Sequence, residues 1–253
     1  NANSRKKPLD RNINGISIIE YSLEETYPHS IDSYTEGFLF HDNKLFESTG
    51  SPENFPNTRS VIGVVNLKTG KLDVKVEIDR NKYFGEGILF FNNKLYQLTY
   101  KNQLGFIYDS KDFKQIGTFN YLNKEGWGMT TDGSSIIMSD GTNFITYWDP
   151  DSLKEIKKLN ITYNGSSALY ANELEYIKGF IYANIWTTNY IAKIDPSNGK
   201  IVGLVDLTLL FLKARKENPK SEATNGIAYD SIKDKVFVTG KFWPYIFEIR
   251  FKH

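Results

Sequence analysis

One sequence phrase recurs five times along this chain: a small or polar pair, an apolar run, a turn and a second apolar run. The copies begin at Glu36, Glu86, Trp127, Asn172 and Asn225, so successive starts lie 50, 41, 45 and 53 residues apart. This spacing is typical of a propeller blade of four short strands, in which each phrase forms the inner hairpin. The sequence therefore predicts an all-β fold, a five-bladed β-propeller.

The turns within these hairpins support the assignment. Asp42-Asn43 and Asn92-Asn93 separate the two apolar runs of the first two copies. Asn and Asp tolerate the backbone geometry of tight turns better than most residues. One helical insertion is also predicted, over residues 207–221, where an apolar and basic run ends near Pro219.

The last blade lacks a fourth strand, because its third strand, Tyr245–Phe251, reaches the end of the sequence. An apolar segment at residues 15–22 precedes the first hairpin and has no partner of its own. Pairing it as the outer strand of the last blade would close the ring and cover an exposed edge. We expect a disordered extension over residues 1–12 and a single propeller domain over residues 13–253.

The composition excludes several classes of partner and cofactor. With 31 basic and 30 acidic residues spread along the chain, no charged patch for nucleic acid or a membrane surface is predicted. Cysteine is absent, which excludes disulfides and thiolate chemistry, and the three His lack the spacing of a zinc site. We expect a monomer without a metal or cofactor.

Two features bear on localisation. The chain begins at Asn1 without Met, and we expect that a targeting or tethering segment has been removed. Two N-glycosylation sequons, Asn160-Ile161-Thr162 and Asn164-Gly165-Ser166, fall in a predicted surface turn. Together they favour the secretory pathway or another extracytoplasmic location.

Polar and aromatic residues occupy equivalent positions in the repeats. The five copies each place their first residue at the start of the innermost strand, where the blades of a propeller crowd around its axis. Asp140, Trp186 and Lys241 follow the second strands of three blades. Such groups often serve only to satisfy buried polar atoms, and for Asp140 and Asn225 this interpretation is favoured. For the whole set we favour a ligand-binding or active site.

Six motifs fall at corresponding places in the repeats, within residues 18–251. They are Tyr34-Thr35-Glu36-Gly37, Phe84-Gly85-Glu86-Gly87, Glu125-Gly126-Trp127-Gly128-Met129-Thr130-Thr131-Asp132-Gly133, Asn172-Glu173-Leu174-Glu175-Tyr176, Ala183-Asn184-Ile185-Trp186 and Val238-Thr239-Gly240-Lys241-Phe242-Trp243-Pro244. In order and spacing they resemble the motif series of the glutamine cyclotransferase family, the glutaminyl cyclases of plants and bacteria. A series of six is far more specific than any one short pattern.

The resemblance implies an enzyme that converts the N-terminal Gln of peptides and proteins to pyroglutamate and releases ammonia, without zinc. It implies that Glu86 is the catalytic acid/base and that Asn172 and Lys241 polarise the amide. Trp127 and Trp186 would line the glutamine pocket.

The other candidate substrate-binding residues are Tyr34, Glu36, Asn225 and Asp140. At one of them the chain departs from the family pattern, which usually has Gln where Glu36 stands. Glu36 is expected to contact the amine or the amide of the substrate.

Two alternatives stay open. Glu36, Glu86, Asn172 and Asn225 could form an oxygen-rich Ca²⁺ site in a metal-dependent propeller hydrolase. The propeller could also be a binding platform without enzymatic activity, since a fold alone does not name a function. Activity after chelation would separate the first from a cyclase, and turnover of Gln-initiated peptides would exclude the second.

Overall fold

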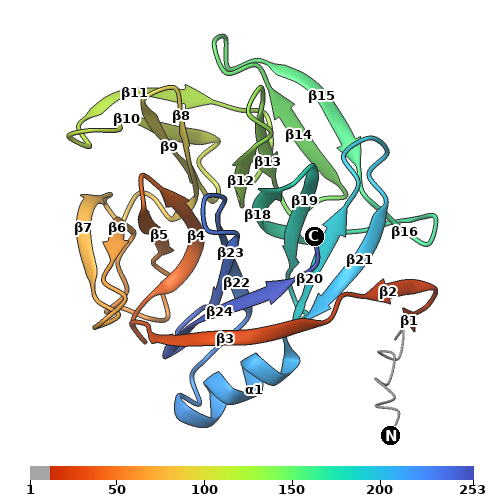
Figure 1. Cartoon of the computed structure of the whole chain (residues 1–253). Coiled ribbons are helices and arrows are strands. Elements are labelled where there is room, and N and C mark those ends of the chain that lie inside the picture. The colour runs from red at the N-terminus through yellow and green to blue at the C-terminus, as the bar shows by residue number, and fades with distance from the viewer. Residues whose placement is uncertain (1–11) are drawn as a thin grey trace, which may run out of the picture.

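Five antiparallel sheets surround a central axis in the computed structural model, which describes residues 12–253 (Figure 1). From the axis outward, blade one consists of β4 (Tyr34–His41), β5 (Lys44–Gly50), β6 (Val61–Val65) and β7 (Leu72–Glu77). Blade two consists of β8 (Gly85–Phe91), β9 (Lys94–Thr99), β10 (Leu104–Asp109) and β11 (Gln115–Asn120). Blade three consists of β12 (Met129–Thr131), β13 (Ile136–Ser139), β14 (Phe144–Trp148) and β15 (Glu155–Asn160). Blade four consists of β18 (Ala171–Ile177), β19 (Phe180–Ile185), β20 (Tyr190–Ile194) and β21 (Ile201–Asp206). The fifth is β22 (Thr224–Asp230), β23 (Lys235–Gly240), β24 (Tyr245–Phe251) and β3 (Tyr21–Pro28). The predicted five-bladed propeller is confirmed.

The inner hairpins form where the repeats predict them. Asp42, Asn43, Asn92 and Asn93 all have positive φ, between 47° and 61°. Two consecutive residues with positive φ are the signature of the two-residue hairpin turn that matches the twist of the strands. The turn residues therefore fix the register of the first two blades.

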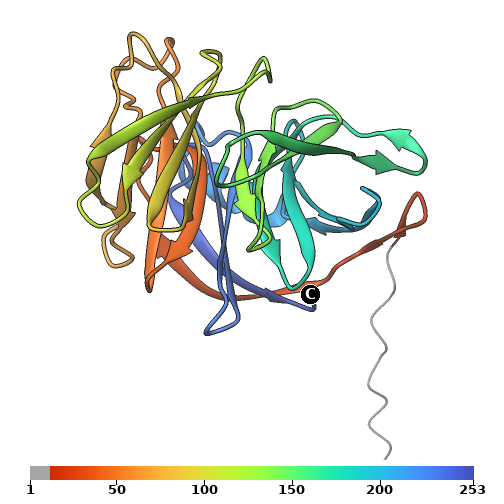
Figure 2. The same cartoon turned by 90° about the horizontal axis from the view of Figure 1, so that it is seen from above.

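The fifth blade is closed by the N-terminal part of the chain, but by a later segment than expected. β3 pairs with β24 from Tyr21↔Phe251 to Tyr245↔Pro28. The earlier apolar residues form β2 (Ile16–Ile18), which pairs in parallel with β21 of blade four. β2 and β1 (Asn12–Ile13) lie at the outer edge of the ring in both views (Figures 1 and 2). The expected extension lies outside the described residues, apart from Asn12, which begins β1.

The predicted helical insertion is α1 (Thr208–Glu217), which lies against the fifth blade. Its Leu210 and Ala214 are buried in the apolar cluster that contains Trp243 and Phe247. A small hairpin, β16 (Thr162–Tyr163) with β17 (Ser166–Ser167), links blades three and four. In residues 12–253 no helix has the length and apolar character needed to cross a membrane.

β-Bulges interrupt four of the five innermost strands at the position where the repeats begin. The register shifts fall between Thr35/Gly37, Gly85/Ile88, Ala171/Leu174 and Thr224/Ile227. A bulge bends its strand and redirects the side chain at the extra residue. Each bulge contains the first residue of its repeat, namely Glu36, Glu86, Asn172 or Asn225. The fold therefore re-aims these four side chains at one end of the axis.

Close approach of the inner strands depends on the second residue of each repeat, which directly follows the first residue named above. It is glycine in four of the blades: Gly37, Gly87, Gly128 and Gly226. A Cβ at Gly128 would collide with the main-chain oxygen of Asn172 in the next blade. In blade four the equivalent residue is Glu173, whose carboxyl group accepts main-chain N–H hydrogen bonds from Phe38 (3.2 Å) and Ile227 (2.7 Å). One carboxyl thus links the inner strands of blades one, four and five.

Candidate active site

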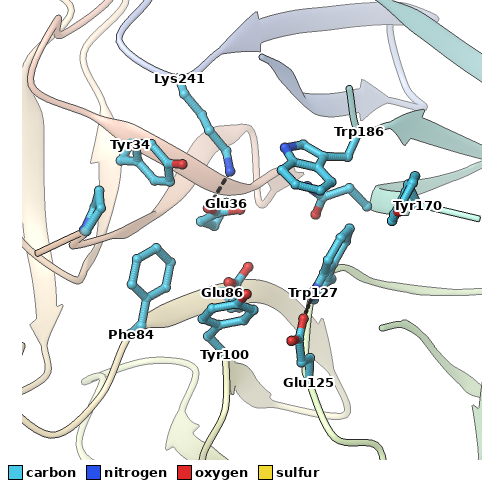
Figure 3. A pocket seen from close by; sticks show the side chains of 12 residues that line it. Tyr34, Glu36, Phe84, Glu86, Tyr100, Glu125, Trp127, Tyr170, Trp186 and Lys241 are labelled. Atoms are coloured by element: carbon cyan, nitrogen blue, oxygen red, sulfur yellow. Dashed lines mark hydrogen bonds and ion pairs between the residues drawn. The ribbon is translucent and has the colours of Figure 1, made fainter. Parts of the chain in front are cut away.

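A pocket of about 430 Å³ opens at the end of the axis where the innermost strands begin (Figure 3). Its lining residues are Tyr34, Glu36, Pro52, Phe84, Glu86, Tyr100, Glu125, Trp127, Tyr170, Asn172, Trp186 and Lys241. Seven of them belong to the set that the sequence singled out. The pocket thus joins residues from all five blades.

An ion pair lies at the base of this pocket. The Nζ of Lys241 is 2.6 Å from Oε1 of Glu36, and both side chains are buried. Lys241 also lies over the ring of Tyr34, 4.2 Å from its centroid. Burial disfavours the charged form of Lys241, but the carboxyl groups of Glu36 and Glu86 outweigh burial, so the pKa of Lys241 is raised. Lys241 therefore carries a permanent positive charge.

Glu86 faces Glu36 across the pocket (Figure 3). Burial raises the pKa of Glu86 well above its ordinary value, and the neighbouring Glu36 raises it further. Burial raises the pKa of Glu36 as well, but Lys241 opposes this shift. Two adjacent buried carboxyls cannot both ionise easily, and the lysine contacts Glu36. Of the two carboxyls, Glu86 therefore holds a proton more readily, and Glu36 is the one whose negative charge the lysine stabilises.

Asn225 holds the carboxyl group of Glu36 by a hydrogen bond. Its Nδ2 donates to Oε2 of Glu36 at 3.1 Å and to the main-chain oxygen of Thr35 at 2.9 Å. Asn225 does not line the pocket and is fully buried. The structure places it as a residue that orients Glu36, although it was predicted to bind substrate.

Asp140, which was predicted to bind substrate, lies outside the central pocket and lines the neighbouring hollow instead. Its carboxyl group accepts hydrogen bonds from Nδ2 of Asn123 (2.8 Å) and from Oγ1 of Thr142 (2.6 Å). The short loop after β13 folds back on the carboxylate, which therefore serves that loop. A position after a second strand does not suffice to direct a side chain toward the axis.

Asn172 points an uncommitted amide into the site. Its side chain is buried among the pocket residues, and its Oδ1 has no hydrogen-bond partner among residues 12–253. A buried polar atom without a partner is uncommon in a folded protein. The Oδ1 of Asn172 is therefore available to accept a hydrogen bond from a bound molecule.

Five lining residues were not singled out from the sequence: Pro52, Phe84, Tyr100, Glu125 and Tyr170. Phe84 and Glu125 stand in the motifs around Glu86 and Trp127, which was a usable signal. Glu125 accepts a hydrogen bond from Nε1 of Trp127 at 2.8 Å and so fixes the indole. Pro52, Tyr100 and Tyr170 lie outside the repeated phrase, so no alignment of the repeats could identify them.

The alternative Ca²⁺ site would have to displace contacts that already hold Glu36. Within residues 12–253, no three His, Asp or Glu side chains are placed to share a metal ion. One oxygen of Glu36 is paired with a lysine ammonium and the other accepts from Asn225. A cation on that carboxylate would compete with Lys241.

Comparisons with known proteins show the family to which this chain is related. The family model described as glutamine cyclotransferase matches residues 2–251. A glutaminyl-peptide cyclotransferase of Arabidopsis thaliana is 37% identical over 246 residues, covering 96% of this chain and 73% of that protein. The crystal structure of Myxococcus xanthus glutaminyl cyclase matches with a TM-score of 0.81 and 29% identity, covering 92% of this chain and 96% of that one. The chain belongs to the glutamine cyclotransferase family.

Proposed function

We propose that the central pocket binds the N-terminal glutamine of a peptide or protein and closes it to pyroglutamate with release of ammonia. One observation carries the proposal: a buried carboxyl with a raised pKa, Glu86, stands beside a buried lysine and the amide of Asn172 in a single aromatic-walled pocket. The pocket therefore offers an acid, two hydrogen-bond donors and apolar walls. The family membership selects which reaction these groups serve.

The substrate provides its own nucleophile. The α-amine attacks the side-chain carbonyl carbon, a C–N bond forms, and the bond from that carbon to the amide nitrogen breaks. A free α-amine has a pKa of about 7.7 to 8.0, so a useful fraction is neutral near pH 7. The pocket contributes by holding the side chain folded back, because correct orientation lowers the barrier of a ring closure.

Glu86 moves the proton. The attacking amine must lose one proton and the departing nitrogen must gain one, so a single carboxyl can serve both steps. Because its pKa is raised, Glu86 can donate a proton to the leaving nitrogen and recover one from the new ring nitrogen. Protons balance, and Glu86 returns to its starting state.

Lys241 and Asn172 stabilise the oxyanion. The ammonium of Lys241 has three donors, and Glu36 occupies one of them, which leaves others for a substrate oxygen. Donors fixed before reaction are worth more in a buried pocket than in water. The indoles of Trp127 and Trp186 line the same pocket and hold the aliphatic stem of the glutamine.

The decisive experiment compares a Gln-initiated peptide with the same peptide initiated by Asn. We expect the mass loss of one NH₃ and ammonia release from the Gln peptide alone, because the amide of Asn is one carbon too short to form the five-membered ring. The reaction is repeated after exhaustive chelation. Loss of activity that a divalent cation restores would support the metal-dependent alternative, and no turnover of any Gln peptide would support the binding platform.

A further inference from the structure

Three aromatic rings continue the pocket wall outward to solvent. The rings of Trp127 and Tyr170 are nearly parallel, with an interplanar angle of 10° and centroids 6.5 Å apart. Trp186 stands almost perpendicular to both, at 5.7 Å from Trp127 and 5.5 Å from Tyr170. Tyr170 and Trp186 are each 40% exposed (Figure 3). The rings form an apolar corner that the protein itself leaves uncovered.

The opposite wall of the pocket is different. There, Phe242 packs against Tyr34 at 5.2 Å and against Phe55 at 4.8 Å between centroids. Tyr34 also packs edge-on against Phe84 at 6.0 Å. Phe242 is only 4% exposed, so this cluster is closed by its own contacts. Uncommitted aromatic surface is therefore concentrated on the Tyr170 side.

The backbone fixes this corner in an unfavourable conformation. Tyr170 and Thr187, the residue after Trp186, both have a φ of 72°, in the left-handed region that side chains with a Cβ rarely adopt. Hydrogen bonds hold the two segments: Tyr170 N–H donates to Gly141 O at 3.0 Å, and Trp186 N–H donates to Tyr170 O at 2.9 Å. Strain of this kind persists where the surrounding structure enforces it, and often at binding sites.

The corner of three aromatic rings also borders a second hollow. A second depression of about 510 Å³ lies beside the pocket, and Glu125, Trp127 and Tyr170 line both. Phe144, which is 39% exposed, also lines this depression. The two hollows are therefore separated by the aromatic residues themselves, and a chain leaving the pocket on this side crosses Tyr170.

We propose that Tyr170, together with the solvent-facing parts of Trp127 and Trp186, forms a subsite for the side chain of the residue after the glutamine, and that it favours large apolar or aromatic residues; the inner parts of the two indoles hold the glutamine stem. The inference rests on the proposed function. Consecutive Cα atoms are about 3.8 Å apart, so with glutamine in the pocket the second side chain must lie at its rim. Aromatic rings pair well in parallel-offset and edge-to-face geometries, both of which this corner offers.

The test measures kcat/KM for Gln-Phe-Ala-amide, Gln-Lys-Ala-amide and Gln-Gly-Ala-amide. We expect the wild type to prefer Phe over Gly on the order of tenfold, as partial burial of a large apolar side chain would give. Tyr170→Asn removes the ring, while Asn tolerates the left-handed backbone. The Phe/Gly ratio of kcat/KM should fall toward 1 in this variant. Tyr170→Phe keeps the ring and should keep the ratio.

The matched control is Ile232→Ala, an exposed apolar residue outside both hollows, which should leave the ratio unchanged. Thermal melting checks that each variant is folded. A wild-type ratio near 1, an unchanged ratio in Tyr170→Asn, or a preference for Lys over Phe would each overturn the subsite while leaving the proposed cyclase intact. Absence of turnover with all three peptides would overturn both.

Discussion

Two pairs of carboxyl groups on the inner strands have different roles in the molecule. Glu36 and Glu86 face a pocket and a lysine. Glu173 and Glu175 accept main-chain N–H hydrogen bonds from neighbouring strands, with Ile227 donating to Glu173 at 2.7 Å and Tyr229 to Glu175 at 3.1 Å. The first pair shares its pocket with a buried lysine, whereas the second pair connects the blades through main-chain hydrogen bonds.

The pKa shifts alone would not separate these pairs. Burial raises the pKa of Glu173 well above its ordinary value and that of Glu175 to about 8. Burial, together with Glu36, shifts Glu86 in the same direction. Structural carboxyls also titrate abnormally, so a shifted pKa indicates a functional site only when the group reaches a cavity and has a chemical partner. Substitutions in the two pairs should therefore change different quantities.

The largest loss of activity is expected for Glu86→Gln. We expect kcat to fall by roughly 10² to 10⁴, the usual effect of losing a general acid or base. The amide is nearly isosteric, so the melting temperature should change little. Steady-state kinetics on a Gln peptide check this, and near-normal turnover would refute the assignment of Glu86.

Lys241→Ala is expected to lower kcat on the order of 10² to 10³, because it removes an oxyanion donor. It also leaves Glu36 without its ion-pair partner, so the variant should be less stable than Glu86→Gln. Separate measurement of kcat and KM is required. A change confined to KM would make Lys241 a substrate-binding residue without a part in the chemical step.

Glu173→Gln should act on stability. A glutamine has one acceptor oxygen and a donor amide, so it cannot satisfy the N–H groups of both Phe38 and Ile227. We expect a loss of about 1 to 3 kcal/mol in the free energy of unfolding, measured by chemical denaturation. The decrease in kcat should be much smaller than for Glu86→Gln. A stable but inactive variant would contradict the division between the two pairs.

Glu36→Gln should move the pH profile. The negative charge of Glu36 raises the pKa of Glu86, so its removal lowers that pKa. Glu86 then loses its proton at lower pH, and the alkaline limb of kcat/KM shifts toward acid. The acidic limb of the kcat/KM profile, which the pKa of the substrate amine sets, should not shift. An unshifted alkaline limb would show that Glu86 is not the group that titrates there.

Asp140→Asn should have the smallest effect. Asp140 lies outside the pocket and serves its own loop, so we expect kcat/KM to change by no more than about twofold, as for most substitutions away from a site. The change from carboxyl to amide is the same as in Glu86→Gln, which makes it a matched control. A large loss would return Asp140 to the substrate-binding set.

The sequence revealed those parts of the molecule that obey the repeat. Glu36 and Glu86 could be identified because each occupies the same bulged position in its blade, so an alignment of the repeats places them at equivalent positions. Tyr170 could not, since it lies between blades and its placement depends on a strained loop. The strand that closes the last blade was predicted too early in the chain, at residues 15–22. Most side chains of β3 are exposed, so β3 lacks the apolar pattern on which the prediction depended, and that pattern is strongest just before it.

The pairing of β3 with β24 joins residues as distant as Tyr21 and Phe251. Lys241 follows β23 in that same blade, while its partner Glu36 lies in the first. The two halves of the ion pair therefore cannot meet until nearly the whole chain is available, and pairings between such distant residues form slowly. Catalytic competence should appear as a late event in folding, so a nascent or truncated chain has no partly working site.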